Sequence, residues 1–422
     1  MDYGKNHKRI SNWERGILNL MSKKRIIRCC DQLMVVGLII YAISATTSTS
    51  GMTVGVILAS LGWVIRMLLT KKFEIKGVAL NLPIFIFLGM LVLSALTSSI
   101  PIPQSFNTVR SIGEKVLLYY LVINGIKEER HARWLLACLI GSLCLIAAYE
   151  TGLVIGNPTP ERHGEMISNK ALGGCLGMVI PLVISMMFLT SSSWKIRGNL
   201  IISLTIMLIC LNLNSSRGAW LGNICALTFL GLFMNRKILL GLGIVIILSL
   251  LLLPKQQMYR VVNMVNPQYV ANLERIYLWK SALSMIKEHP FLGHGPGSFQ
   301  ILYPEYMPEV PEETKEKFYP PYGHKHAHNI FLHLGAEAGV FTLLAIIWLF
   351  VAVFKWGWKV FQHTEKQWSR ILVLGLLACL IDFITHGMVD YTLVGETGYL
   401  LWFYLGLISW IGTQLNNKEK ER

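Results

Sequence analysis

The chain has 422 residues, of which 53% are hydrophobic and 15% charged, and its mean hydropathy is +0.49. This balance excludes a water-soluble globular enzyme, whose surface needs more charged residues. The formal charge of +15 suits either nucleic acid or an anionic membrane surface, and the apolar content decides for the membrane. Eight cysteines without a CxxC spacing argue against a disulfide framework and against a zinc module.

Apolar stretches of membrane-spanning length recur along the chain. A bilayer core about 30 Å thick is crossed by roughly 20 mostly apolar residues, and the sequence offers about twelve such stretches. They lie near residues 31–48, 52–70, 79–98, 111–126, 134–154, 171–190, 199–214, 216–234, 238–253, 328–354, 371–389 and 397–413. We therefore predict an all-α, polytopic membrane protein, and we interpret the first stretch as a span and not as a removable signal peptide.

Lysine and arginine concentrate on one side of these predicted spans. They fill a basic arm (residues 1–30), residues 71–76, 127–133, 195–197, 236–237 and 355–370, and a tail (residues 414–422). The opposite loops carry chiefly Arg110, Arg162, Lys170 and Arg217. Because cytoplasmic loops retain positive charge, we expect both termini in the cytoplasm, with which an even number of spans agrees.

One long polar segment, residues 254–327, separates spans 1–9 (31–253) from spans 10–12 (328–413), and by this count it is extracytoplasmic. Asn266 and Pro267 predict the start of a helix that runs to Lys287. Its expected apolar face comprises Val270, Leu273, Tyr277, Leu283 and Ile286. After His289 and Pro290, a run of glycines from Gly293 to Gly297 indicates turns.

Two arginines on this side are candidates for binding an anion. Arg217 lies at a short polar break between two apolar spans, and Arg275 lies on the predicted loop helix. A guanidinium keeps its charge and offers a planar set of donors, so two of them can clamp a diphosphate from separate elements. Alternatively, Arg217 is a snorkelling residue at a span end and Arg275 is an ordinary solvated loop residue.

His328 and Asn329 stand where the loop re-enters the membrane. On a helix, Gly335 and Gly339 would share a face with His328 and let another helix approach closely. The positive end of the helix dipole would keep His328 neutral and able to accept a proton. The alternatives are an interfacial histidine without chemistry, and a weak metal site with His324 and His326, which no carboxylate spacing supports.

Asp382, His386 and Asp390 are spaced by four residues on the eleventh predicted span. Such a ladder suits a proton relay of a transporter or structural partners for Arg217 or Lys115, and Asp390 could orient a histidine or an arginine. Phosphate-loop, HExxH, GxSxG and dinucleotide-binding motifs are absent from the sequence, so we expect neither nucleotide-driven work nor a cofactor.

Three stretches of the second half of the chain resemble the O-antigen ligase and polymerase family of bacterial membrane glycosyltransferases. They are Ser216-Arg217-Gly218-Ala219-Trp220-Leu221-Gly222, the run from Arg275 to Trp279 continued by His289-Pro290 to Gly297, and His328-Asn329 with nine residues before Gly339. The last is similar to the ligase pattern, except that Thr342 stands where the pattern has a further glycine.

The resemblance implies a many-helix fold similar to lipid-dependent (GT-C type) glycosyltransferases, in the bacterial inner membrane with its site facing the periplasm. It also implies a glycan donor on undecaprenyl diphosphate and an acceptor hydroxyl, for which we favour a sugar of the lipid A core. Arg217 and Arg275 would hold the diphosphate and His328 would be the base, with inversion at the sugar and no required metal. Asp390, Asn329, Arg162, Arg110 and Lys115 are candidates for substrate binding, although the last three could equally be interfacial anchors.

Two other functions remain open at this stage. One is a polymerase of the same family, whose acceptor is another repeat unit. The other is a secondary transporter or a flippase for lipid-linked glycans, motivated by about twelve spans and the acidic ladder. We expect no nucleic-acid partner, and the sequence leaves the oligomeric state open.

Overall fold

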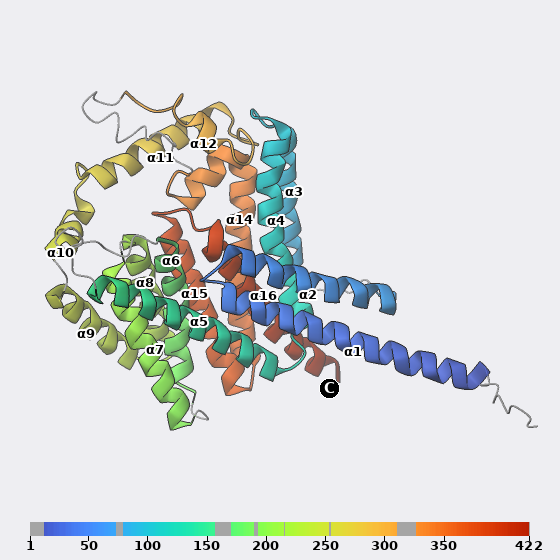
Figure 1. Ribbon diagram of the computed structural model, residues 1–422. Coiled ribbons are helices and arrows are strands. Elements are labelled where there is room, and N and C mark those ends of the chain that lie inside the picture. Colours follow the sequence, from blue (N-terminus) through green and yellow to red (C-terminus); the bar gives the residue numbers. More distant parts are fainter. Residues whose placement is uncertain are drawn as a thin grey trace, which may run out of the picture.

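The computed structural model describes residues 12–72, 79–156, 170–189, 193–214, 216–252, 255–309 and 326–421, and these form helices joined by turns (Figure 1). Each of the predicted apolar stretches overlaps one helix. These helices are α1 (Asn12–Ser44), α2 (Thr49–Thr70), α3 (Asn81–Leu96), α4 (Ile102–Gly125), α5 (Glu129–Gly156), α6 (Lys170–Met187), α7 (Trp194–Leu213), α8 (Arg217–Phe233), α9 (Lys237–Leu252), α14 (Ile330–His363), α15 (Gln367–Gly387) and α16 (Gly395–Glu421). The predicted all-α, polytopic fold is confirmed.

Six helices are long and apolar enough to cross a membrane among the described residues: α2, α5, α7, α14, α15 and the Lys23–Ser44 part of α1. Four shorter apolar helices, α3, α6, α8 and α9, accompany them. Large apolar side chains face outward on them, for example Leu145 and Leu251, each 74% exposed, and Leu240, 69% exposed. Exposing these side chains to water would cost free energy, whereas contact with lipid tails would not. The chain is therefore a multi-pass membrane protein.

The core of the bundle is built around α15 and α16. Helix α15 packs against α6, α8 and α14, and α16 packs against α4 and α6. Trp402, Phe403 and Tyr404 of α16 and Phe383 of α15 are almost fully buried. The helices are held together by this apolar packing, so the polar residues among them stand out as exceptions.

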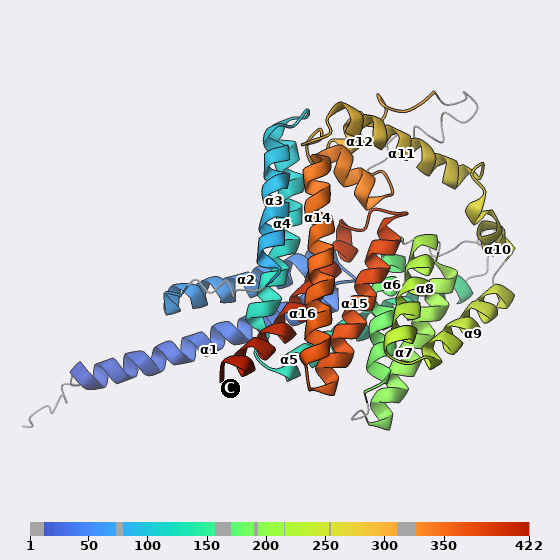
Figure 2. The ribbon, with the colours of Figure 1, turned by 180° about the vertical axis from the view of Figure 1, so that it is seen from behind.

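Helices α1 and α2 form a hairpin that extends sideways from the bundle in both views (Figures 1 and 2). Three glycines, Gly37, Gly55 and Gly62, lie in their contact, where an added Cβ would meet backbone atoms of the partner helix at 2.5–2.7 Å. The absence of side chains at these positions lets the two backbones approach closely.

The long loop contains α10 (Lys255–Val262), a 3₁₀ turn η1 (Asn263–Val265), α11 (Val270–Glu288) and the short α12 (Phe299–Leu302). Helices α11 and α12 cover one end of the bundle, which we call the loop end, and the turn between α14 and α15 lies at the other (Figures 1 and 2). At that turn Lys366 Nζ lies 3.6 Å from Glu129 Oε2, and Arg133 lies over the Trp368 ring. The basic segments 127–133 and 366–370 therefore share an end, as the charge pattern predicted.

The predicted details of the loop helix need correction. Helix α11 begins at Val270 behind Tyr269, whereas Asn266 Oδ1 accepts a hydrogen bond from Gln268 N in the preceding turn. An asparagine side chain stabilises such a turn as readily as a helix start. The buried apolar side chains are Leu278, Ala282 and Met285, while Leu283, assigned to the apolar face, is 47% exposed. The tertiary contacts, and not the approximate periodicity, select the buried face.

The predicted glycine stripe beneath His328 is also wrong in its geometry. His328 precedes the helix, and Gly339, with φ of +72°, interrupts α14 with a kink. An added Cβ on Gly335 would meet Ile286 of α11, and one on Gly339 would meet the backbone of Phe291 and Leu292. Gly335 thus admits another helix, as predicted, but this is the loop helix α11, and Gly339 admits the loop backbone.

Replacing Gly339 should therefore weaken the contact between α14 and the loop. At Gly339 φ is +72° and ψ is 177°, a region that essentially only glycine adopts and that costs another residue about 1–3 kcal/mol, and the alanine Cβ would additionally collide with the Phe291 carbonyl. We expect Gly339→Ala to lower the thermal unfolding temperature in detergent. Gly141→Ala in α5, where an added Cβ meets nothing within 4 Å, is the matched control and should not lower it. Equal unfolding temperatures for both variants would contradict the assigned contact.

Candidate active site

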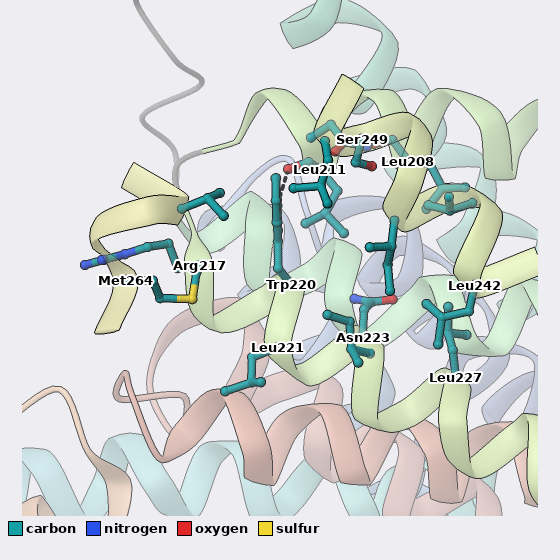
Figure 3. Close-up of a pocket in the computed structure, with 16 residues that line it drawn as sticks. Leu208, Leu211, Arg217, Trp220, Leu221, Asn223, Leu227, Leu242, Ser249 and Met264 are labelled. Carbon is teal, nitrogen blue, oxygen red and sulfur yellow. Dashed lines mark hydrogen bonds between the residues drawn. The ribbon is translucent and has the colours of Figure 1, made fainter. Parts of the chain in front are cut away.

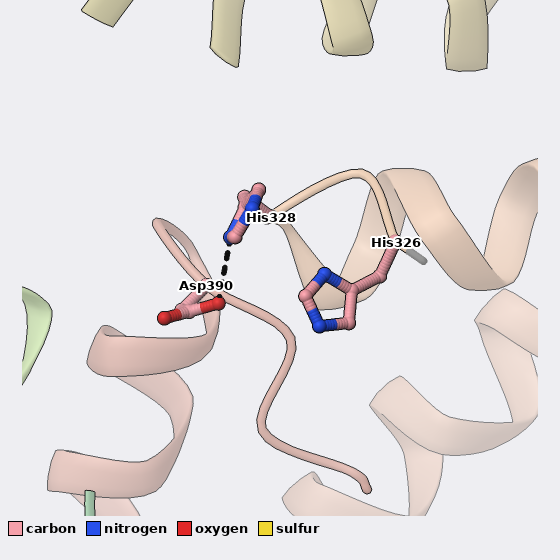
Figure 4. Close-up of side chains that lie close together, drawn as sticks. All are labelled: His326, His328 and Asp390. Carbon is pink, nitrogen blue, oxygen red and sulfur yellow. Dashed lines mark hydrogen bonds and ion pairs between the residues drawn. The ribbon is translucent and has the colours of Figure 1, made fainter. Parts of the chain in front are cut away.

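A histidine and an aspartate pair where α14 begins and α15 has ended. His328 Nδ1 lies 2.8 Å from Asp390 Oδ1, and the side chains are 13% and 18% exposed (Figure 4). Asp390 Oδ1 also accepts a hydrogen bond from Tyr391 N at 2.8 Å. An ionised carboxylate only accepts, so the proton of the short contact belongs to His328 Nδ1. The other ring nitrogen, Nε2, then carries the lone pair when the ring is neutral.

The environment keeps Asp390 charged. Burial by itself would raise the pKa of this carboxyl, but the hydrogen bond from His328, the charges of His328 and His386, and the Tyr391 amide hold it well below its ordinary value. The site therefore fixes the tautomer of His328 through Asp390 and can stabilise the charge that the ring acquires on accepting a proton.

Asn329 positions His328 by joining two helices. Its Oδ1 accepts from Phe331 N at 2.9 Å and Leu332 N at 3.0 Å, which caps α14. Its Nδ2 donates to Met388 O, 2.9 Å away, in the turn after α15. His328 itself has φ of +48°, a left-handed conformation that costs a non-glycine residue about 1–2 kcal/mol. The cap and the Asp390 hydrogen bond hold the residue in this conformation.

Arg217 and Arg275 line one cavity at the loop end. Arg217 is the first residue of α8 and Arg275 lies on α11; the cavity between them measures about 300 Å³ and extends to Val389. The Arg217 guanidinium lies 5.6 Å from the centroid of the Tyr269 ring. Burial lowers the pKa of Arg275, and the charges of Asp390 and Glu274 oppose this. Two cations from separate elements therefore face one space beside Asp390.

A second, apolar cavity shares Arg217 with the first. It measures about 250 Å³ and lies between α7, α8 and α9 (Figure 3). Leucine, isoleucine and valine side chains form most of its wall, among them Leu208, Leu227 and Leu242, and Trp220 Nε1 donates to Leu211 O at 2.8 Å. Arg217 thus stands at the junction of a cationic and an apolar space.

The acidic ladder divides into two groups. Asp382 Oδ1 accepts from Asn223 Nδ2 at 3.3 Å inside the bundle, and His386 Nε2 lies 3.3 Å from Ser216 Oγ and 3.9 Å from Asp390 Oδ2. Among the described residues, His386 therefore belongs with the site and Asp382 packs with α8. The sequence suggested Arg217 or Lys115 as partners of the ladder. The structure instead places Asn223 beside Asp382, and Ser216 and Asp390 beside His386.

A buried polar network behind His328 was not predicted. His333 Nδ1 accepts from Ala327 N at 3.4 Å, and His333 Nε2 lies 3.4 Å from Glu337 Oε2. Glu337 Oε1 accepts from Phe299 N at 3.0 Å, which ties α12 to α14. The spacing of four residues between His333 and Glu337 was a visible signal, but their partners come from the loop and only the fold supplies them.

The remaining candidates do not gather at this site. Arg110, 74% exposed at its side chain, forms an ion pair with Glu114, and Lys115 donates to Ser111 and lies over the Tyr399 ring. Arg162 and His324 lie outside the described residues. Of the predicted site residues, the structure thus brings together Arg217, Arg275, His328, Asn329 and Asp390.

Comparison with known protein families gives a match to one region of the chain. Residues 202–347 match the family model described as O-antigen ligase, which supports assignment to that family and a ligase or polymerase function. The matched region contains Arg217, Arg275 and His328, whereas Asp390 lies beyond it. No curated protein matches the chain.

The two roles of Asn329 can be separated by substitution. Asn329→Ser keeps a capping oxygen but is too short to reach Met388 O, whereas Asn329→Ala loses both interactions. A lost cap costs about 1 kcal/mol, and a lost hydrogen bond about 0.5–1.5 kcal/mol. The thermal unfolding temperature in detergent should be highest for wild type, lower for Asn329→Ser and lowest for Asn329→Ala. If Ser and Ala are equally destabilised, the side chain does not cap α14.

Proposed function

Starting from its O-antigen ligase domain, we propose that this chain transfers a glycan from undecaprenyl diphosphate to an acceptor hydroxyl. The observation that carries the proposal is the position of Asp390. This carboxylate holds His328 through a 2.8 Å hydrogen bond and interacts electrostatically with Arg275, whose guanidinium lines a cavity with Arg217. A base and a binding site for a dianionic leaving group are therefore adjacent.

The leaving group explains the two arginines. As the bond between the sugar C1 and the diphosphate oxygen breaks, negative charge accumulates on that oxygen. Fixed guanidinium groups in a poorly solvated cavity stabilise this charge without reorganising. They also supply the neutralisation that a divalent cation would otherwise provide, so the proposed transfer needs no metal. The apolar cavity that shares Arg217 suits the isoprenoid chain of such a donor.

The base explains the pair of His328 and Asp390. The acceptor oxygen forms a bond to C1 while its proton passes to His328 Nε2, the nitrogen left free by the Nδ1 hydrogen bond to Asp390. The ionised Asp390 stabilises the resulting imidazolium. Attack opposite to the departing diphosphate inverts the configuration at C1. The proton then leaves His328 for solvent, which regenerates the base.

The loop end faces the periplasm in this proposal. The shared position of the basic segments 127–133 and 366–370 at the opposite end supports this orientation, because positively charged loops stay in the cytoplasm. The proposed location is thus the bacterial inner membrane, where lipid-linked glycans and the lipid A core meet on the outer leaflet.

Removing the base should abolish transfer without unfolding the protein. We expect His328→Ala to lower turnover by about 10² to 10⁴ fold, and Asp390→Asn to lower it substantially as well. Without the carboxylate the tautomer of His328 is no longer fixed, and the positive charge that the ring acquires during transfer loses its partner.

These variants are compared in purified form with a lipid diphosphate donor and an acceptor, in the presence of a chelator. The control is His363→Ala, which removes an exposed histidine from the other end of α14. Normal turnover by folded His328→Ala would remove this residue from the mechanism.

The acceptor distinguishes a ligase from a polymerase. We favour a lipid A core sugar, and mass analysis of products from one defined donor should show the glycan attached to that core. Products elongated by repeat units, with an untouched core, would identify a polymerase instead. Gradient-dependent uptake into proteoliposomes with no new covalent product would favour the transporter or flippase and would contradict the transfer reaction.

A further inference from the structure

His326, His328 and Asp390 form a cluster of potential metal ligands. One ring nitrogen of each histidine and one carboxylate oxygen all lie within 4.8 Å of one another (Figure 4). His326 and His328 are two residues apart before α14, and Asp390 comes from the segment after α15. The carboxylate that the local sequence lacks is supplied by the fold.

His326 has an uncommitted nitrogen at this position. Its Nδ1 is buried without a hydrogen-bond partner among the described residues, and its ring meets that of His328 edge to face with centroids 4.7 Å apart. A nitrogen without a hydrogen-bond partner loses no interaction within the protein when a metal ion binds it. His333, by contrast, has its nitrogens directed at Ala327 N and Glu337.

We propose that His326, His328 and Asp390 bind a divalent transition-metal ion, with Zn²⁺ as the best match, and that this ion inhibits the protein. Two imidazoles, one carboxylate and a water make up a common four-coordinate zinc site. Metal–ligand bonds of about 2.0–2.2 Å bring tetrahedral ligands to roughly 3.4 Å from one another. To reach this spacing, the 2.8 Å distance between His328 Nδ1 and Asp390 Oδ1 must widen by about 0.6 Å, and the separations of up to 4.8 Å in the cluster must shorten by up to about 1.4 Å.

The local charges favour one ion of modest affinity. Asp390 contributes a negative charge, and the two histidines bind as neutral rings. Arg275 interacts with the same carboxylate and opposes a second cation. The site therefore differs from a permanent structural zinc centre, which is enclosed by four protein ligands.

Inhibition follows from the tautomer of His328. In the metal-free site Nδ1 carries the proton and Nε2 accepts. A metal on Nδ1 takes over that nitrogen, and the ring proton moves to Nε2, so no proton is lost overall. Nε2 is then a donor and cannot take the proton of an acceptor hydroxyl. This inhibition rests on the proposed function, whereas metal binding itself does not.

Binding is tested first, without substrates. Full-length protein purified in detergent without a histidine tag is titrated with Co²⁺, whose visible absorption intensifies in a four-coordinate site. We expect one equivalent to bind to wild type and Zn²⁺ to displace it. The signal should be lost in His326→Asn and retained in His363→Asn. An unchanged signal in His326→Asn, or weak absorption from several exposed sites only, overturns the proposal.

Inhibition is tested second, as the ratio of turnover with and without Zn²⁺ within each variant, so that altered basal rates do not matter. We expect saturating Zn²⁺ to lower wild-type turnover by about 10² fold or more, with recovery in chelator. The ratio should approach one in His326→Asn. Binding without inhibition would refute the tautomer argument but leave the metal site in place, and equal inhibition of both proteins would refute the site as its cause. Absence of turnover in any condition would instead count against the proposed function.

Discussion

The hydrogen bond between His328 and Asp390 is the interaction on which the site depends. It joins the first residue before the α14 cap to the segment after α15, two parts of the chain separated by 62 residues. A buried carboxylate of this kind is stable only with partners, and His328, His386 and the Tyr391 amide provide them. The same bond fixes which nitrogen of His328 can accept a proton. The same hydrogen bond therefore holds two segments of the chain together and sets the proton-accepting nitrogen of His328.

The surroundings of this pair keep it in place. Asn329 caps α14 and reaches Met388 O, and Glu337 ties α12 to α14 through Phe299 N. Gly339 lets the loop backbone lie directly against α14 at its kink. As a result the loop is bound to the bundle by specific polar and close-packed contacts, which brings Arg275 on α11 near Asp390. The cavity between Arg217 and Arg275 exists because the loop is held in this position.

The charges at the loop end divide into separate tasks. Arg217 and Arg275 border the cavity, where an anionic group would be neutralised, while Asp390 pairs with His328 and interacts electrostatically with Arg275. If Asp390 formed direct ion pairs with both arginines, it would partly neutralise the positive charge that is available to a bound anion. Asp390 accepts a hydrogen bond from His328, and Arg217 lies beside Tyr269 and the apolar cavity. In a site with little water, charges interact strongly at short range, so the arrangement of these groups has a large effect on anion binding and on the histidine.

The sequence by itself determined the helices that lie in the membrane, because lipid requires long apolar runs with internally satisfied backbones. It also identified Arg217, Arg275, His328 and Asp390, since ionisable residues near a membrane are costly enough to stand out. Their pairing was decided only by the tertiary structure. Periodicity assigned Leu283 to the buried face of α11 and placed His328 on a helix with Gly339, whereas contacts between distant segments decided otherwise. The carboxylate beside His326 and His328 was likewise invisible in the local sequence, because it arrives from beyond α15 through folding. The sequence pattern indicates whether each residue prefers water, lipid or the protein interior. Only the tertiary structure determines which side chains contact each other.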